Sequence, residues 1–377
     1  MISARRRTGA LLLVCRALGS DAWSRTPLAR ALCPAEPSWD AALALAADTH
    51  VATALSGAID RRRLRVPPGI AEELRRHQLL NTVRNVRFRE CLSEAVLALN
   101  AAGIEPLLFK GALELAASAA SVLSDRWMDD LDLLVQPEQM AAAGQALQTI
   151  GYGPEPGRAF MHPHELPYTR HGAPGPIELH SALGSRPLAF VLPAAEAWEA
   201  SSELGVGSGR GRALTPTHRV LHNVLHSTVQ DLNHAVGGLP LRQLVILSRL
   251  ASDYEDALDW PWIHSRMQEH GLSRQLRDHL WLTHRLAGMA LPAVPRPRGR
   301  VIGREIHEAR VLANFALGWP ADAHRNLRFA FGRAYLDSLY GHGNRPLPLA
   351  AARARHAMNV ARRDGAAAFT QTFLRRG

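Results

Sequence analysis

The sequence predicts an α+β protein, with a small mixed β-sheet core, a helical N-terminal lead-in and a helical C-terminal region. Two observations predict this class. Apolar residues recur at helical spacing before residue 104 and again after residue 190. Between these positions, short apolar runs bounded by glycine and proline alternate with helical segments, as buried strands do. The expected parts are a helical region (1–103), an α/β core (104–190), a helical domain (191–290), and a linker with basic helices (291–377).

Three helices are predicted in the N-terminal region. Basic residues before an apolar run at residues 11–14 resemble a secretion signal, but Arg16 cuts the run short and no clear cleavage site follows, which favours a helix. Residues 39–59 are dense in good helix formers. A further helix is expected from Ile70 to about Ala102, because Gly103 is a suitable C-terminal cap.

The central region is expected to supply the strands of the sheet. Short apolar runs are flanked by turn residues, and the segments between them are rich in alanine and leucine. Pro137 stands at the permitted first position of one of these helices. The predicted strands are residues 104–109, 131–135, 166–170 and 176–180, and the predicted helices are residues 112–120 and 137–150.

Beyond residue 190 the pattern becomes helical again. The glycine-rich segment 205–218 is predicted to be a loop, because it is not followed by the strand-to-helix unit that binds phosphate. Residues 291–300 are rich in proline and arginine, which is typical of a linker. The predicted helices are residues 217–230, 241–252 and 272–290.

The length and composition are those of a globular chain with more than one domain. A chain of 377 residues can bury a substantial core. Hydrophobic residues make up 47% of it and charged residues 21%, which is within the globular range. Its three cysteines include no C-x-x-C pair, so a disulfide framework is not indicated and we expect a reducing cytoplasm. No apolar run reaches the roughly 18 residues that a membrane span needs.

The chain is strongly basic. A net charge of +10 favours an anionic partner such as a nucleotide, a nucleic acid or an acidic membrane surface. The arginines are scattered along the chain, however, and no aromatic residues are interleaved with them to form a platform for bases. Abundant alanine and arginine are also typical of a GC-rich genome. We therefore expect no nucleic-acid partner.

Two aspartates begin one of the predicted strands. Residues two apart in a strand share a face, so Asp130 and Asp132 place two carboxylates side by side. The two carboxylates repel each other unless a divalent cation such as Mg²⁺ or Mn²⁺ binds between them, together with the phosphates of a nucleotide. Glu178, in another predicted strand, supplies a third carboxylate. The pattern D-x-D alone is common, but three carboxylates around a metal suit phosphoryl transfer.

Lys110 is the only lysine among 44 lysine and arginine residues. A compact ammonium can approach a phosphate oxygen where a planar guanidinium does not fit, so Lys110 and Gly111 are candidates for binding a nucleotide, although one lysine can also survive by chance. Arg126 is expected either to hold a triphosphate or to pair with Asp129. His180 shares a strand face with the third acid, so it either orients an acceptor or a carboxylate, or is structural.

Further histidines are candidates for lining a cleft. His218, His222 and His226 are spaced four apart, on one face of a helix. The glutamate of the H-E-x-x-H zinc motif is missing there. We expect His222 and His226 to line a cleft opposite the α/β core, with simple packing as the alternative. His162 and His164 lie in a proline-flanked segment, where a metal site is a weaker possibility.

The order of these motifs resembles the bacterial uncharacterised nucleotidyltransferase family, part of the DNA polymerase beta nucleotidyltransferase superfamily. The shared features are K-G, D-x-D-L-L-V, a proline-started helix ending in G-Y, and I-E-L-H, and the resemblance covers about residues 10–290. It implies that Asp130, Asp132 and Glu178 hold Mg²⁺ for an NTP substrate. Lys110 and Gly111 stand where the superfamily usually has a Gly-Ser phosphate loop, which is a departure from its pattern.

The resemblance implies an enzyme that transfers an NMP from an NTP to a hydroxyl or phosphate of an acceptor. Family members are often encoded beside peptide or polysaccharide biosynthesis genes, so the acceptor is expected to be a small molecule, a sugar or a peptide natural product. The alternative is a non-catalytic binding module of the same fold within a biosynthetic assembly. A third hypothesis, supported only by the basic charge, is a polymerase-like or RNA-modifying enzyme.

Overall fold

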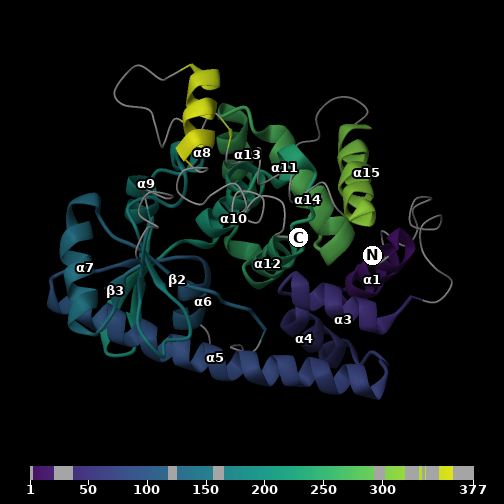
Figure 1. The fold of residues 1–377 in the computed structure, drawn as a ribbon, viewed down its shortest axis with the longest axis horizontal. Helices are drawn as coiled ribbons and strands as arrows, with labels where there is room; N and C mark the ends of the chain where they lie inside the picture. The colour runs from purple at the N-terminus through teal and green to yellow at the C-terminus, as the bar shows by residue number, and fades with distance from the viewer. Residues whose placement is uncertain are drawn as a thin grey trace.

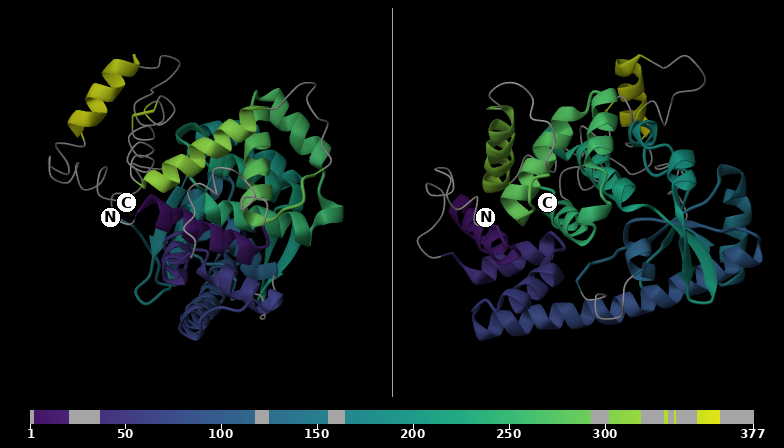
Figure 2. Two further views of the ribbon diagram at one scale, coloured as in Figure 1. Left: turned by 90° about the vertical axis from the view of Figure 1, so that its right-hand side faces the viewer. Right: turned by 180° about the vertical axis from the view of Figure 1, so that it is seen from behind.

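The protein is a helical molecule built around one mixed sheet. The computed structural model describes residues 3–20, 37–117, 125–155, 165–292, 302–318, 331–332, 336 and 348–359. Figure 1 shows the sheet at one end, a group of helices at the other, and helix α5 (Pro68–Ala101) running beneath both. The views in Figure 2 show the same two parts from the side and from behind. The α+β class is confirmed.

The N-terminal region contains α1 (Ala4–Leu18), α3 (Trp39–Asp48), α4 (Ala52–Arg62) and α5. The helices expected near the start of the chain and from Ile70 to Ala102 are confirmed. The single helix expected over residues 39–59 is wrong, because the chain turns at His50, whose φ of 56° is left-handed. Neither glycine nor proline marks this break, so helix propensity gave no warning of it.

Helix α5 joins two apolar cores. Its second half packs against the sheet through Phe88, Leu92 and Val96, which are spaced four apart on one face and fully buried. Its first half packs with α4 through Ile70 and Leu74 in a second core, which also contains residues of α1 and α3. The 34-residue helix therefore fixes the helical lead-in relative to the sheet.

The sheet has seven strands in the order β3-β4-β5-β2-β1-β7-β6. Its centre is mixed, because β2 pairs parallel with β5 and antiparallel with β1. All four predicted strands form, although the first is only two residues long. The strands are β1 (Leu107–Leu108), β2 (Leu131–Leu134), β3 (Gly153–Pro154), β4 (Glu165–Thr169), β5 (Ile177–His180), β6 (Ser202–Val206) and β7 (Gly209–Ala213).

The prediction of a loop over residues 205–218 is wrong. Its first half belongs to the β6–β7 hairpin, which turns at Gly207 with a φ of 60°. Gly211 must lack a side chain, since a Cβ there would lie 2.7 Å from Leu108 Cδ1 of the neighbouring strand. Glycines that permit close strand packing resemble loop glycines in sequence. The sheet thus extends to residue 213, past the expected end of the core at residue 190.

The remaining described helices cover the sheet and build the helical part. They are α6 (Lys110–Ala117), η3 (Pro137–Gln139), α7 (Met140–Thr149), α8 (Arg186–Val191), α9 (Ala194–Glu199), α10 (Pro216–Leu225), the π-helical turn η4 (His226–Gln230), α11 (Asn233–Val236), α12 (Leu241–Asp253), η5 (Glu255–Ala257), α13 (Trp260–Glu269), α14 (Ser273–Ala287) and α15 (Ile302–Leu317). Most of the expected linker lies outside the described residues. Within the described ranges, no helix is both long and apolar enough to cross a membrane.

Candidate functional site

The centre of the sheet carries a group of buried polar side chains. The parallel pairing of β2 with β5 places Asp132 directly beside Glu178. His180 follows Glu178 by two residues and so lies on the same face of the sheet. The exposed fractions are 0% for Asp132, 7% for Glu178 and 2% for His180. Asp130 immediately precedes β2 and lines the same cleft as Asp132.

Asp132 is the hub of this group. Lys110 Nζ donates a hydrogen bond to Asp132 Oδ1 over 2.6 Å, and His180 Nε2 lies 3.0 Å from the same oxygen. His180 Nε2 is also 3.7 Å from Glu178 Oε2. The other oxygen, Asp132 Oδ2, is buried and has no hydrogen-bond partner among the described residues. A buried acceptor without a partner is costly, which indicates that a ligand or ion completes it.

Lys110 is held in an uncommon backbone conformation. Its φ of 48° lies in the left-handed region, at the junction between β1 and α6. For a lysine this conformation costs of the order of 1 kcal/mol, and such strain is concentrated at functional sites. A Cβ on Gly111 would lie 2.6 Å from Met128 Cε, which is the far end of a flexible side chain, so a shift of Met128 would relieve the contact. The strain in the K-G pair therefore lies at Lys110.

The charges at the hub reinforce one another. Burial disfavours the charged form of Asp132, but Lys110 and His180 outweigh it and hold the pKa of Asp132 well below its usual range. Burial alone would lower the pKa of Lys110, yet attraction to Asp132 and Asp130 raises it above its usual value. Burial and then repulsion from Asp132 raise the pKa of Asp130. Lys110 and Asp132 are thus both charged at neutral pH.

A cleft of about 160 Å³ is lined by Lys110, Asp130 and Asp132, whereas Glu178 and His180 are not among its lining residues. Its other wall comes from the helical part and includes His222 and His226, which confirms the expectation for these two histidines. His218 instead contacts Trp262 and Thr215. Two further buried atoms of cleft residues, Asn223 Oδ1 and Arg126 Nε, have no hydrogen-bond partner in the described part of the chain. The cleft therefore presents several unused polar atoms.

His222 faces the hub as a neutral ring. Burial, followed by repulsion from His226 and Lys110, lowers the pKa of His222 well below its usual value. Its Nε2 lies 2.9 Å from the carbonyl oxygen of Leu183. Phe109 lies edge-on to both His222 and His180, with ring centroids 5.4 Å and 5.0 Å away. One aromatic ring thus packs between the two walls of the cleft.

Arginines and a glutamate form a second layer around the hub. Arg126 bonds to Glu114, which also lies 3.5 Å from Arg219 Nη2. The partner of Asp129 is Arg242, whose Nη1 is 3.0 Å from Asp129 Oδ2, so the expected pairing of Arg126 with Asp129 is not the one in the structure.

These arginines extend the site beyond the cleft. Arg126, Arg219 and Arg242 also line an adjoining pocket of about 110 Å³ that includes His50, Trp127 and Tyr254. The sequence offered a signal for Glu114, which follows Lys110 by four residues and so lies on the same helix face. Arg219 and Arg242 reach the cleft only through tertiary packing. The candidates His162 and His164 lie outside the described residues.

Comparison with known protein families finds a match to most of the chain. The family model described as "Uncharacterised nucleotidyltransferase" matches residues 35–288, which include every strand of the sheet and both walls of the cleft. Neither the curated proteins nor the solved structures contain a match to the chain. Helices α1 and α15 lie outside the matched range. The chain belongs to the uncharacterised nucleotidyltransferase family.

Proposed function

We propose that the protein is a Mg²⁺-dependent nucleotidyltransferase that moves an NMP from an NTP to a hydroxyl or phosphate of a small acceptor. The observation that carries this proposal is the buried Asp132 Oδ2, which lacks a partner among the described residues in a cleft lined also by Asp130. Membership of a nucleotidyltransferase family supports the reaction class. The base, the acceptor and the metal dependence are part of the proposal.

The donor set suits a hard cation. Asp130, Asp132 and Glu178 would hold Mg²⁺ or Mn²⁺, because these ions prefer carboxylate oxygens and leave positions for phosphate oxygens and water. Burial and repulsion from Asp132 raise the pKa of Asp130 despite the nearby Lys110 and Arg242, so a cation bound beside Asp130 would stabilise its charged form. When bound, the metal neutralises the charge that develops on the phosphate and the leaving group.

The basic side chains would bind the triphosphate. Lys110 already directs its ammonium into the cleft at Asp132, and Arg219 and Arg242 lie on the opposite side. The planar guanidinium group of an arginine can donate to two phosphate oxygens at once, whereas the ammonium of the lysine contributes a point charge. Each of these cations is already held by a carboxylate or a carbonyl oxygen, so little side-chain ordering is needed on binding.

The proposed reaction is a single displacement. An oxygen of the acceptor attacks the α-phosphorus, the bond from the α-phosphorus to the bridging oxygen breaks, and pyrophosphate leaves. Glu178 takes the proton of an attacking hydroxyl. His180 lies 3.0 Å from Asp132 Oδ1 and 3.7 Å from Glu178 Oε2, so it positions both carboxylates instead of contacting the substrate. The adjoining pocket with Trp127 and Tyr254 suits a small acceptor such as a sugar or a peptide product.

The test is to incubate the protein with labelled NTPs, Mg²⁺ and candidate sugars and peptides, and to measure pyrophosphate release and the mass of the products. We expect release from the unchanged protein and from Asp256→Asn, a matched change at an exposed aspartate. We expect none from Asp130→Asn or Asp132→Asn. NTP binding without turnover with any acceptor would favour the non-catalytic module, and no NTP binding at all would overturn both hypotheses.

A further inference from the structure

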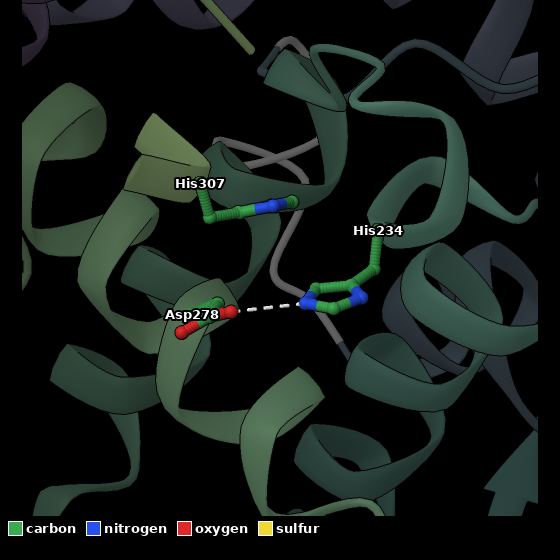
Figure 3. Close-up of side chains that lie close together, drawn as sticks. All are labelled: His234, Asp278 and His307. Carbon is green, nitrogen blue, oxygen red and sulfur yellow. Dashed lines mark hydrogen bonds and ion pairs between the residues drawn. The ribbon is translucent and has the colours of Figure 1, made fainter. Parts of the chain in front are cut away.

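A second group of buried ligand-type side chains lies outside the cleft. His234 on α11, Asp278 on α14 and His307 on α15 come from three different helices, and Figure 3 shows them turned toward one another. His234 Nε2 is 3.0 Å from Asp278 Oδ2, and the rings of His234 and His307 stack with centroids 4.4 Å apart. One donor atom from each residue lies within 4.8 Å of the other two.

A small cavity adjoins this group, and two of the residues that line it have buried polar atoms without a hydrogen-bond partner in the described part of the chain. Its volume is about 10 Å³, which is roughly the space of one water-sized sphere. It is lined by His234, His307, His279 and Asn233. His279 Nε2 and Asn233 Oδ1 are buried and have no hydrogen-bond partner among the residues that the structure describes. Two such polar atoms beside a cavity of this size indicate a single small occupant, either a water molecule or an ion.

The carboxylate is held as a metal ligand is usually held. Arg277 donates to Asp278 Oδ1 over 3.2 Å, which leaves Oδ2 directed at His234. Hydrogen bonds of this kind orient ligating carboxylates in metal sites. Arg274 Nε is 3.4 Å from Oδ2, but the Arg274 side chain is 62% exposed and can turn into solvent. The cost of placing a cation near Arg274 is therefore small.

Helix α15 is anchored to two neighbouring helices by residues that follow His307. Glu308 accepts from Trp281 Nε1 over 2.8 Å and from Arg285 Nε over 3.1 Å, which ties it to α14. Asn314 Nδ2 donates to the carbonyl oxygen of Val236 over 3.0 Å, which ties the helix to α11. The ring of His307 is thus placed by contacts that do not involve a metal. Preorganised ligands of this kind favour binding.

We propose that His234, Asp278 and His307 form a structural site for a divalent transition-metal ion, with Zn²⁺ as the best-suited ion. Two imidazoles and one carboxylate are a common donor set for zinc, and His279, Asn233 or water would complete a tetrahedron. The bound ion fastens α15 onto α11 and α14. His307 lies beyond the family match at residues 35–288, so the site does not depend on the proposed nucleotidyl transfer.

The test is a titration of the chelator-stripped full chain with Co²⁺ and Zn²⁺, followed by calorimetry and by the visible absorption of Co²⁺. The background is Asp132→Asn, which keeps the cleft from binding the probe ion. We expect one equivalent of Co²⁺ to bind with a tetrahedral spectrum. His307→Gln and His234→Gln should weaken binding by at least roughly 100-fold, the upper end of what loss of a supporting residue costs.

The matched control is His171→Gln, at an exposed histidine on the turn between β4 and β5. It should bind Co²⁺ as the background does. Circular dichroism of each variant establishes that it is folded. Two separate histidine variants are used so that the test still works if one of them does not fold. Equal Co²⁺ binding by the folded His307→Gln and His234→Gln proteins and by the control would overturn the proposal. So would the absence of Co²⁺ and Zn²⁺ binding by the background.

Discussion

The two ligand-rich groups of this chain differ in scaffold and in donor chemistry. The cleft group, Asp132, Glu178 and His180, stands on two paired strands and contains two carboxylates and one histidine. The helical group, His234, Asp278 and His307, stands on three helices and contains two histidines and one carboxylate. The first lies at a cleft of about 160 Å³, and the second adjoins a cavity of about 10 Å³.

The comparison relates the type of donor atom and the size of the adjoining space to two different kinds of metal site. Carboxylates suit hard ions that keep open positions for phosphate and water, as a substrate site needs. Imidazoles suit zinc and its neighbours, and a space of about 10 Å³ has no room for a substrate, which suits a structural role. Each carboxylate also has cations beside it. Lys110 donates to Asp132 Oδ1 in the cleft, whereas in the helical group Arg277 donates to Asp278 Oδ1 and the exposed Arg274 lies 3.4 Å from Asp278 Oδ2.

The largest expected effect is the loss of nucleotidyl transfer when the cleft group is changed. Asp132→Asn removes the hub carboxylate, so nucleotidyl transfer should fall by roughly 100- to 1,000-fold or more, as it does when one preorganised electrostatic group is lost. The measurement is pyrophosphate release at saturating NTP. Binding of Zn²⁺ to the helical group should be unchanged in the same variant. Loss of both properties together would show that the two groups are not independent.

A second change separates charge from backbone conformation at the same hub. Lys110→Met leaves Asp132 buried without its ammonium partner and should lower the free energy of unfolding by about 3 kcal/mol, as breaking buried ion pairs does. Lys110→Gly loses the same pair but relieves the left-handed φ of 48°, so it should retain about 1 kcal/mol more than Lys110→Met. Urea unfolding of the two variants measures the difference. Equal stabilities would argue against strain at Lys110.

Loading the helical group should stabilise the fold. A metal held at 100 times its dissociation constant adds about 2.7 kcal/mol to the free energy of unfolding. We expect this gain with Zn²⁺ and a much smaller one with Mg²⁺, measured by thermal unfolding of the full chain carrying Asp132→Asn, so that the proposed Mg²⁺ site of the cleft does not contribute. His307→Gln should abolish the gain with Zn²⁺, whereas the exposed-site control His171→Gln should keep it. The opposite ion preference would contradict the assignment of donor sets.

The smallest expected effect is a difference in acid sensitivity in the absence of metal. Burial and repulsion among the rings lower the pKa of His279 to about 3 and that of His307 to about 4. Below about pH 6.5 these two histidines therefore bind protons in the unfolded chain but not in the folded chain. The free energy of unfolding falls with decreasing pH until the folded-state pKa values are reached. Asp132, with its lowered pKa, loses its contribution only below about pH 4.

Urea unfolding between pH 7 and pH 4.5 measures this difference. His307→Gln should make the decline in stability with decreasing pH less steep, because it removes a histidine that stays unprotonated in the folded protein. A decline in stability that is as steep in His307→Gln as in the unchanged protein would contradict this origin of the acid sensitivity.

The sequence predicted the cleft group better than the helical one for a physical reason. The two-residue period of a strand places Glu178 and His180 on one face, and short apolar runs marked both β2 and β5. In contrast, His234 and His307 are 73 residues apart and come together only through packing of α15 on α11 and α14. Arg242 likewise reaches Asp129 only in the folded chain.

Errors in the predicted elements have a related cause. Glycine signalled a loop over residues 205–218, where it permits close strand packing at Gly211. Good helix formers surround His50, where the chain nevertheless turns so that this ring stacks on Trp127 at 5.5 Å. In both places tertiary contacts overrode local preference.

The most direct test of the cleft is the relaxation of water protons by Mn²⁺ in the presence of an NTP, because a protein that binds the ion and the nucleotide enhances this relaxation. The prediction is an enhancement with the unchanged protein, and its loss in Asp130→Asn and Asp132→Asn but not in Asp256→Asn. An undiminished enhancement in the two cleft variants would place the metal and nucleotide elsewhere and contradict the assignment of Asp130, Asp132 and Glu178.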